Sequence, residues 1–281
     1  MAAATGATFV WGIGNLAVTA APLGGLALAF HRLWLGALLY GIALAVAGRL
    51  RFTAAQVRIA LPGAIAFALD IATFFEATRH TTVADAVTIS ALQPLVILAV
   101  AGSRFGERIR RHHVICAVIA TLGVALVVQG SRGTGQVTLY GEVMAVAALF
   151  AWSWYFVASK QARQVLGTVE YLTLVFALGV PVLAVLGLAS GQLTDPANAF
   201  DSSTWWWVLA VVLLPGSGHL LINWAHNHTT ITYASLVTLF MPVISTVGAA
   251  IWLDQPVTAL QIIGITVVIG ALIPVITKER A

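Results

Sequence analysis

Long apolar stretches, separated by short polar ones, follow one another along the whole chain. Each stretch is continuously apolar over about 20 residues, the length that a helix needs to cross the hydrocarbon layer of a membrane. The strands of a membrane β-barrel would instead alternate polar and apolar residues. The pattern therefore predicts ten membrane-spanning helices, at residues 5–21, 24–48, 58–79, 82–103, 112–130, 139–160, 168–190, 204–225, 230–252 and 257–277.

The composition excludes a water-soluble protein. Hydrophobic residues make up 60% of the chain and charged residues 9%, whereas a soluble domain has roughly 45 to 50% and about 25%. The first residues lack the basic start and the cleavage site of a signal peptide, so we expect the first span to be retained. A single cysteine, Cys116, excludes an intramolecular disulfide and a cysteine-based metal cluster.

The basic residues predict the orientation of the chain, because lysine and arginine in short loops stay on the cytoplasmic side. If the N-terminus is inside, the outer loops hold only Arg79 and Arg132, and Arg32 lies within the second span. The inner loops and the C-terminus then hold Arg49, Arg51, Arg58, Arg104, Arg108, Arg110, Arg111, Lys160, Arg163, Lys278 and Arg280. We therefore expect both termini in the cytoplasm. Membrane orientation accounts for the sequence pI near 9.6 without a nucleic-acid partner.

Two stretches of the chain have nearly the same sequence. HTTVADAVTISALQP covers residues 80–94, and HTTITYASLVTLFMP covers residues 228–242. Five residue types recur 148 positions on, with His80, Thr81, Thr82, Ala86 and Pro94 matched by His228, Thr229, Thr230, Ala234 and Pro242. Each stretch opens the fourth span of a set of five. The repeat therefore predicts two halves, residues 1–130 and 139–277.

A repeat with an odd number of spans enters the membrane in the opposite direction the second time. The two halves are then related by a pseudo-two-fold axis in the membrane plane, a construction that is common in secondary transporters. Such halves can exchange conformations, so that an outward-open and an inward-open state have similar energies. We expect an all-α membrane protein of two inverted five-helix repeats, with substrate bound in a central cavity between them.

Several residues match the pattern of a known family. They are Trp11 and Gly12 in the first span, Arg32, Pro94, Pro242, Glu107, Gly264 and Gly270. On these residues the chain resembles the drug/metabolite transporter superfamily, in particular its bacterial EamA-type members, over nearly its whole length. The chain departs from the family pattern at Asn15, Cys116 and Gln255. Its length, its ten spans and its aromatic content are similar to the branch that exports aromatic amino acids.

Two prolines lie near the middle of the bilayer, about 12 residues into their spans. Pro94 and Pro242 each lack a backbone donor and free a carbonyl one turn back, at Ser90 and Thr238. Broken backbone at this depth either lines a cavity or is satisfied internally by neighbouring hydroxyl groups. The prolines are therefore candidate hinges, with an internally satisfied kink as the alternative.

Charged side chains inside a membrane are candidates for function because their insertion costs about 3 kcal/mol. Asp70 lies deep in the third span and is the candidate for proton coupling. A structural pair with Arg32, the only deep cation, is the alternative, and it would favour facilitated diffusion. Glu76 lies nearer the outer face, where we expect it to be hydrated.

Aromatic residues are numerous in the spans. Trp11 and Trp152 stand at corresponding places in the two halves and, facing each other, could hold a ring or a cation between them. Phe74 and Tyr155 are also deep. We expect Trp154 and Phe75 to face lipid.

The histidine of each repeated stretch has two interpretations. His80 and His228 could relay protons, or they could build a tight turn that recurs because the fold recurs. Thr82 with Asp85 has the spacing of a capping box, and Tyr233 stands where the second stretch would need that acid.

The eighth span carries His219, Asn223 and His226 on one helical face. This face predicts a polar stripe on a cavity wall, whereas a metal site would need a further ligand nearby. Gly216-Ser217-Gly218 resembles part of an intramembrane protease motif, but that motif needs glycine two residues before the serine, and Pro215 stands there.

These patterns predict a secondary transporter in the inner membrane of a bacterium. The first, third, fourth, sixth, eighth and ninth spans should line the cavity. Only Arg32 is available as a deep cation, so phosphate esters are excluded, and aromatic or large neutral amino acids are the expected exported substrates. A planar cationic drug is the second choice. The expected substrate-binding residues are Trp11, Asp70, Phe74, His80, Gln93, Trp152, Tyr155, His219, Asn223 and Tyr233.

We expect no cofactor, no metal and no nucleic acid, with the substrate and the lipid bilayer as partners of a monomer. Scattered polar residues argue against an enzyme, and sparse polarity in mid-membrane argues against a channel. Proton coupling, facilitated diffusion and the physiological direction of transport stay open at this point.

Overall fold

The computed structural model describes residues 1–81, 83–130, 137–199, 201–252 and 257–278, and the architecture within these ranges is entirely helical. Thr82, Arg132, Gln255 and Arg280 lie outside the described residues, as does the side chain of Asp85. The expected capping box at the start of the fourth span therefore stays a prediction.

Helices fill the predicted spans. They are α1 (Ala2–Ala20), α2 (Gly25–Val46), α3 (Ala54–His80), α4 (Val83–Ser90), α5 (Gln93–Phe105), α6 (Arg111–Gly130), α7 (Leu139–Ala162), α8 (Thr168–Ala189), α9 (Trp205–Ala225), α10 (Ile231–Val237), α11 (Met241–Trp252) and α12 (Ala259–Lys278). Among the described residues, nine helical stretches are long and apolar enough to cross a membrane, and Ala2–Val18 is a shorter apolar helix. The expected all-α membrane protein is confirmed.

The fourth and ninth spans are each interrupted at the repeated proline. A break at residues 91–92 separates α4 from α5, and the 3-10 helix Thr238–Phe240 separates α10 from α11. Pro94 and Pro242 are the second residues of α5 and α11, within the first turn, where a backbone N–H has no partner inside the helix. The hydroxyl of Thr121 donates to the freed carbonyl of Ala91 at 3.2 Å. The predicted interruptions are therefore present.

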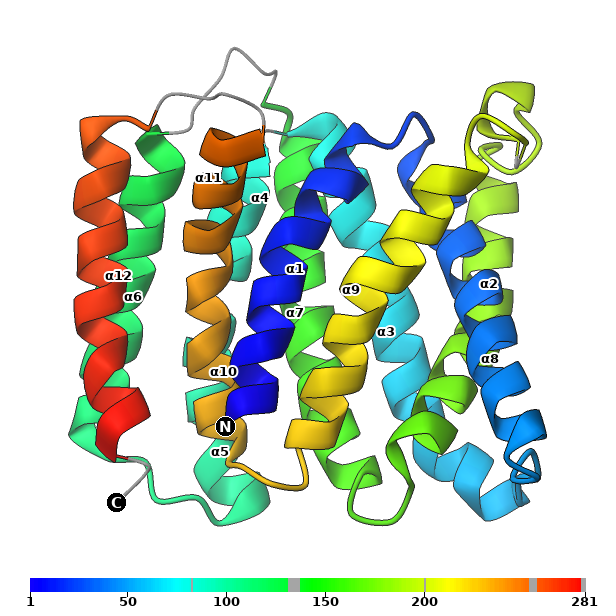
Figure 1. Cartoon of the computed structure of the whole chain (residues 1–281), viewed down its shortest axis with the longest axis horizontal. Helices are drawn as coiled ribbons and strands as arrows, with labels where there is room; N and C mark the ends of the chain where they lie inside the picture. Colours follow the sequence, from blue (N-terminus) through cyan, green and yellow to red (C-terminus); the bar gives the residue numbers. More distant parts are fainter. Residues whose placement is uncertain (82, 131–136, 200, 253–256, 279–281) are drawn as a thin grey trace.

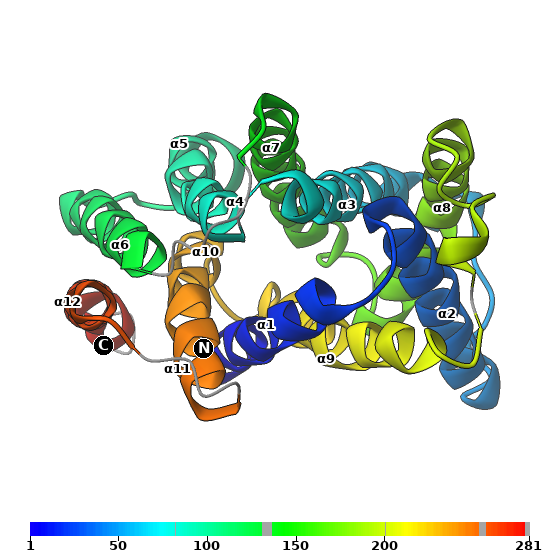
Figure 2. The same ribbon diagram turned by 90° about the horizontal axis from the view of Figure 1, so that it is seen from above.

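The helices of the two halves alternate in space. Helix α1 packs on α9, α3 on α7, α2 on α8, and α6 on α12. Each pair takes one helix from residues 1–130 and one from residues 139–277, and exchanging the halves leaves the set of pairs unchanged. Figure 2 shows α1 and α9 along one side, α3 and α7 along the other, and the remaining two pairs at the ends.

Glycine allows the closest of these approaches. A Cβ on Gly264 in α12 would lie 2.6 Å from the carbonyl oxygen of Gly123 in α6. Small residues let helices approach closely inside a membrane, where no hydrophobic force drives their association. Gly270 has open space around it. Of the two glycines that the family pattern has in the last span, Gly264 is thus the one that packs helices.

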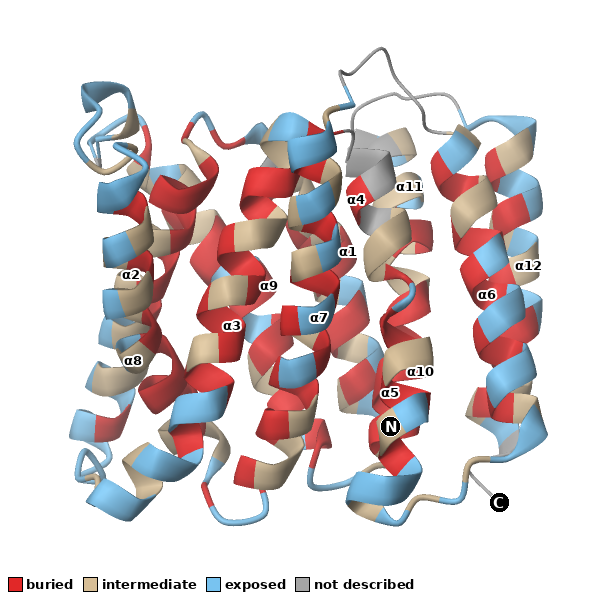
Figure 3. Cartoon of the chain, turned by 180° about the vertical axis from the view of Figure 1, so that it is seen from behind, coloured by how far each residue is buried: buried red, intermediate tan, exposed pale blue. Residues whose placement is uncertain are grey.

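The outer surface of the bundle is apolar. Leu38, Ile42 and Val46 follow one another at helical spacing on α2, and each has at least half of its side chain exposed. Figure 3 shows exposed positions along the outer helices and buried positions toward the middle of the bundle. A large exposed apolar surface marks contact with membrane or protein. It fits a helix bundle surrounded by lipid.

Helix α1 begins and α12 ends at the same edge of the bundle (Figure 1). We call this the terminal edge and the opposite one the distal edge. Helices α1 and α3 run from the terminal edge to the distal edge, whereas α7 and α9 run back.

Candidate functional site

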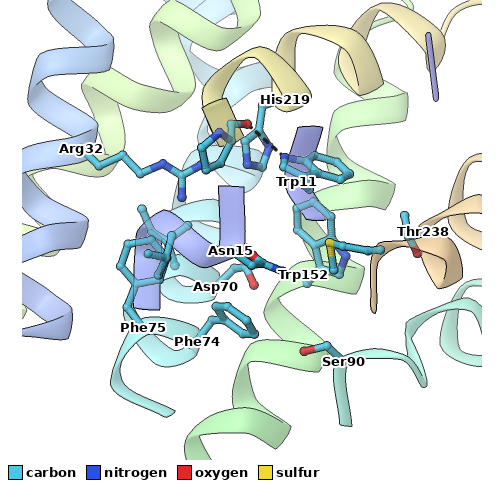
Figure 4. Close-up of a pocket in the computed structure, with 14 residues that line it drawn as sticks. Trp11, Asn15, Arg32, Asp70, Phe74, Phe75, Ser90, Trp152, His219 and Thr238 are labelled. Atoms are coloured by element: carbon cyan, nitrogen blue, oxygen red, sulfur yellow. Dashed lines mark hydrogen bonds between the residues drawn. The ribbon is translucent and has the colours of Figure 1, made fainter. Parts of the chain in front are cut away.

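A pocket lies in the middle of the bundle, between helices of both halves. Its walls come from α1, α2, α3, α4, α7, α9 and the broken ninth span. Figure 4 shows the side chains that face it. The lining residues are Trp11, Asn15, Val18, Arg32, Asp70, Ile71, Phe74, Phe75, Ser90, Trp152, Pro215, His219, Thr238 and Met241. Five of the ten expected substrate-binding residues are among them: Trp11, Asp70, Phe74, Trp152 and His219.

One wall of the pocket is aromatic. The ring centroid of Trp11 lies 5.3 Å from that of Trp152, with the rings edge to face at 77°, and 5.0 Å from that of His219. Trp11 Nε1 donates to the carbonyl of Pro215 at 3.0 Å, which fixes the indole. The two indoles contact each other and leave no gap for a substrate ring between them. The arrangement suggested by the sequence, with a ring held between the indoles, is therefore absent here. The indoles present a continuous aromatic surface instead.

Gly218 makes room for this wall. A Cβ at this position would lie 2.5 Å from Trp11 Nε1 and 2.7 Å from its Cδ1. Gly218, part of the Gly-Ser-Gly segment that resembles a protease motif, therefore allows α9 to pack against the Trp11 indole. The hydroxyl of Ser217 donates to the carbonyl of Leu214 at 2.8 Å on the exposed side of the helix.

Two opposite charges face the same pocket. Arg32 on α2 is 2% exposed and Asp70 on α3 is 9% exposed. In the part of the chain that the structure describes, the ion pairs within 4.0 Å are Arg49 with Glu170 and His80 with Glu76. Arg32 and Asp70 therefore do not form an ion pair within 4.0 Å. Figure 4 shows both side chains at the pocket.

The guanidinium of Arg32 is held by rings. Its Cζ lies 5.7 Å from the ring centroids of Phe67 and of Phe75, within the ~6 Å of a cation–π contact. Nε and Nη2 of Arg32 are buried and have no hydrogen-bond partner among the described residues. The expectation that Phe75 faces lipid is wrong, because its side chain is 3% exposed and lines the pocket. Trp154, which was also expected to face lipid, is 45% exposed.

Tyr155 and Asn223 lie outside the pocket, toward the terminal edge. Asn223 Nδ2 donates to the Tyr155 hydroxyl at 2.7 Å and to the carbonyl of His219 at 2.8 Å. The hydroxyl groups of Ser159 and Tyr171 are 2.8 Å apart in the same region. These buried groups form a floor under the pocket. The predicted shared face of His219, Asn223 and His226 is buried, and only His219 of the three lines the pocket.

The pocket extends from the middle of the bundle toward the distal edge. Helix α1 contributes Trp11, Asn15 and Val18, in order toward that edge, whereas α7 contributes Trp152 alone. Helix α3 likewise contributes Asp70, Ile71, Phe74 and Phe75, whereas α9 contributes Pro215 and His219 and none of its residues nearer the terminal edge. On the terminal side of this pocket, Ala4, Ala7, Phe156 and Ile222 are buried, and a second, separate pocket at the terminal edge is lined in part by Ala2, Leu221 and Trp224.

Charged side chains hold the turn between α9 and α10 at the terminal edge. Lys160 Nζ donates to the carbonyls of His226 at 2.9 Å and Thr229 at 2.6 Å. Glu107 accepts from the backbone N–H of Ile231 at 2.7 Å and from that of Thr232 at 3.1 Å. A carboxylate at the start of a helix satisfies free amides and complements the helix dipole. The turn between α9 and α10 is therefore tied on both sides.

Glu76 takes a structural position near the distal edge. It is 5% exposed, so the expectation that it is hydrated is wrong. Its Oε1 accepts from the N–H of Leu26 at 3.1 Å and from Gln192 Nε2 at 2.8 Å. The carboxylate thereby satisfies the first turn of α2. These two donors and the N-terminus of α2 stabilise the buried carboxylate.

Three further expected residues lie away from the pocket. His80 is exposed at the end of α3, and its ring packs edge to face on Tyr140. Gln93 is fully buried beside the break in the fourth span, and its amide atoms have no partner among the residues described. Tyr233 is 1% exposed, with its hydroxyl 3.5 Å from that of Thr5. His80 lies at the turn that ends α3, with its Nε2 3.5 Å from Glu76 Oε2.

The structure adds pocket residues that the sequence reasoning did not select. Asn15 follows Trp11 by four residues and Val18 follows by seven, so helical spacing from Trp11 could have found them. Ser90 and Thr238 face the pocket from the two broken spans. The described residues contain no group of three His, Cys, Asp or Glu side chains that could hold a metal ion.

Comparison with known proteins agrees with this architecture. The model of the EamA-like transporter family matches residues 1–129 and again residues 139–277. An uncharacterized transporter of Clostridium kluyveri is 22% identical over 232 residues, which cover 79% of this chain and 73% of that protein. One solved crystal structure has the same fold, with a TM-score of 0.80 at 22% identity over 99% of this chain and 96% of the other.

Membrane-length apolar helices around a central pocket, together with the family match, define a multi-pass membrane transporter. The chain belongs to the EamA-like transporter family.

Proposed function

We propose that this chain exports small zwitterionic molecules with an apolar body, foremost aromatic or large neutral amino acids, by alternating access. One observation carries the proposal: an unpaired cation, an unpaired anion and an aromatic wall face one pocket between the two halves. An amino acid offers a carboxylate, an ammonium group and a side chain to match. The pocket would place such a molecule near the middle of the membrane, as in other secondary transporters.

The two halves form the moving parts in this proposal. Residues 1–130 and 139–277 would be inverted five-helix repeats, which is supported by the symmetric pairing of their helices. The basic residues support a terminal edge that faces the cytoplasm, and the bundle would lie in the inner membrane of a bacterium. The described arrangement, in which the central pocket extends toward the distal edge, would then be the state that faces outward. The breaks at Pro94 and Pro242 would serve as hinges.

Asp70 would couple transport to protons. Its carboxylate is not in an ion pair with Arg32, so it is available to exchange a proton with the pocket or to bind an ammonium group. A locked pair would have favoured facilitated diffusion. We further propose that the chain acts as a monomer without enzymatic activity, cofactor or nucleic-acid partner.

The test is uptake of labelled tryptophan, phenylalanine and lysine into proteoliposomes, with and without a pH gradient. We expect saturable uptake of the two aromatic amino acids, driven by the gradient, and little uptake of lysine. Asp70→Asn should lower gradient-driven uptake by at least about tenfold without lowering the amount of inserted protein. Exclusion of all three amino acids would refute the substrate assignment, and normal uptake by the Asp70→Asn variant would refute its role in coupling.

A planar cationic drug is the second candidate. Asp70 beside Phe74 and the two indoles would suit a flat cation. Arg32 argues against it, because a buried guanidinium in the same pocket repels a second positive charge. Uptake of a labelled planar cation, in competition with tryptophan, separates the two candidates.

A further inference from the structure

We propose that Arg32 binds the carboxylate of the transported molecule and so makes a carboxylate a requirement for transport. The inference rests on the proposed function, because it assigns one end of the proposed zwitterion to a residue.

The first observation is the unmet hydrogen-bonding capacity of the side chain. A guanidinium carries five N–H donors, and Arg32 is 2% exposed. Its Nε and Nη2 are buried, with no acceptor among the residues that the structure describes. A buried charged donor without an acceptor is costly. The cost is removed when a ligand brings an anionic acceptor.

The second observation is that the surroundings hold the guanidinium without neutralising it. Phe67 and Phe75 each place a ring centroid 5.7 Å from its Cζ. Rings attract the cation through their faces but accept no strong hydrogen bond. The guanidinium is thus oriented, and its N–H edge stays free for a planar group such as a carboxylate.

The third observation is the position of the opposite charge. Asp70 lines the same pocket, outside ion-pair distance of Arg32. An α-amino acid carries its two charges close together on one carbon, with the side chain on the same atom. The carboxylate would meet Arg32, the ammonium group Asp70, and the side chain the wall of Trp11 and Trp152 (Figure 4).

Matched ligands separate this role from a structural one. Tryptamine has the ring and the ammonium group of tryptophan but no carboxylate. In proteoliposomes, the wild-type protein should take up tryptophan and not tryptamine. Arg32→Gln should raise the KM for tryptophan at least about tenfold, the loss expected for charge-assisted hydrogen bonds. The same change should leave tryptamine uptake equal or higher, since the positive charge near the ammonium is gone.

Arg51→Gln is the matched control, because it removes the same charge from an exposed loop position. It should leave both uptakes unchanged. A fall in the maximal rate of tryptophan uptake in Arg32→Gln, with the KM for tryptophan unchanged, would overturn the inference, since a general structural role predicts it. Equal uptake of both ligands by the wild type would overturn it as well.

A binding measurement keeps the inference separate from the proposed function and from misfolding of the variant. The melting temperature of the purified full chain is measured with 3-phenylpropionate and, in parallel, with 3-phenylpropionamide, which lacks the negative charge. Each measurement is made once in chloride buffer and once in methanesulfonate buffer. The carboxylate alone should stabilise the wild type, in either salt. This result without any amino-acid uptake would keep the Arg32 site and refute amino acids as substrates. Equal effects of acid and amide, or an effect abolished by chloride, would refute the carboxylate site.

Discussion

The sequence His-Thr-Thr occurs at two turns of the bundle, and different groups hold the two turns. At the distal edge, the Thr138 hydroxyl donates to the carbonyl of His80 at 2.6 Å. At the terminal edge, the ammonium group of Lys160 donates to the carbonyls of His226 at 2.9 Å and Thr229 at 2.6 Å. Hydrogen bonds from charged donors are roughly twice as strong as neutral ones. At the distal turn the Thr81 hydroxyl also donates to Glu142 at 3.2 Å, so Lys160 gives the terminal turn two hydrogen bonds from a charged donor, whereas the distal turn has one hydrogen bond to a charged acceptor.

The approach of the backbones differs as well. At the distal turn, helix α7 comes so close that a Cβ on Gly141 would lie 2.6 Å from the carbonyl carbon of His80. At the terminal turn, long side chains reach across the distance instead. Similar local sequences thus build similar turns, while the neighbouring helices decide how firmly each turn is held. The predictions below test this difference by hydrogen exchange, which reports local opening.

The largest effect is expected at the terminal turn. Lys160→Met keeps an apolar stem and removes both charge-assisted hydrogen bonds, which together contribute at least about 2 kcal/mol. Amides of residues 226–230 should exchange more than about tenfold faster, with residues 80–81 unchanged. Arg108→Met, exposed at the same edge, is the control. Unchanged exchange at 226–230 would show that Lys160 does not hold the turn.

A smaller effect is expected from crowding the distal turn. Gly141→Ala places a methyl group against the backbone of His80, and such overpacking costs about 1 to 3 kcal/mol. We expect a lower melting temperature and faster exchange at residues 80–81. Gly216→Ala, where a Cβ meets open space, should change neither. A Gly141→Ala protein with normal stability would mean that α7 moves away without cost.

The smallest effect is expected from the neutral hydrogen bond. Thr138→Val removes the hydroxyl that donates to His80 and that also accepts from the N–H of Gly141 at 3.1 Å. Each such bond contributes about 1 kcal/mol. Exchange at residues 80–81 should rise by less than in Gly141→Ala, and exchange at 226–230 should stay the same. An effect larger than that of Lys160→Met would reverse the comparison between the edges.

Prediction of individual side chains succeeded or failed for a physical reason. Trp154 and Phe75 were both expected to face lipid, and only Trp154 is exposed. Lipid tails are as apolar as the interior of a helix bundle. Hydrophobicity therefore cannot tell which face of a span turns inward. Glu76 failed for a related reason, because its burial depends on the amide of Leu26 and the side chain of Gln192, which are far away in sequence.

The sequence by itself determined the membrane-spanning helices, the breaks at Pro94 and Pro242, and the family. These depend on local properties: the length of an apolar run, the missing donor of proline and the order of short motifs. Only the tertiary structure decided that Arg32 and Asp70 share a pocket without pairing, and that Tyr155 and Asn223 close its floor. Such relations depend on which helices become neighbours, and within a membrane that is decided by packing between distant segments.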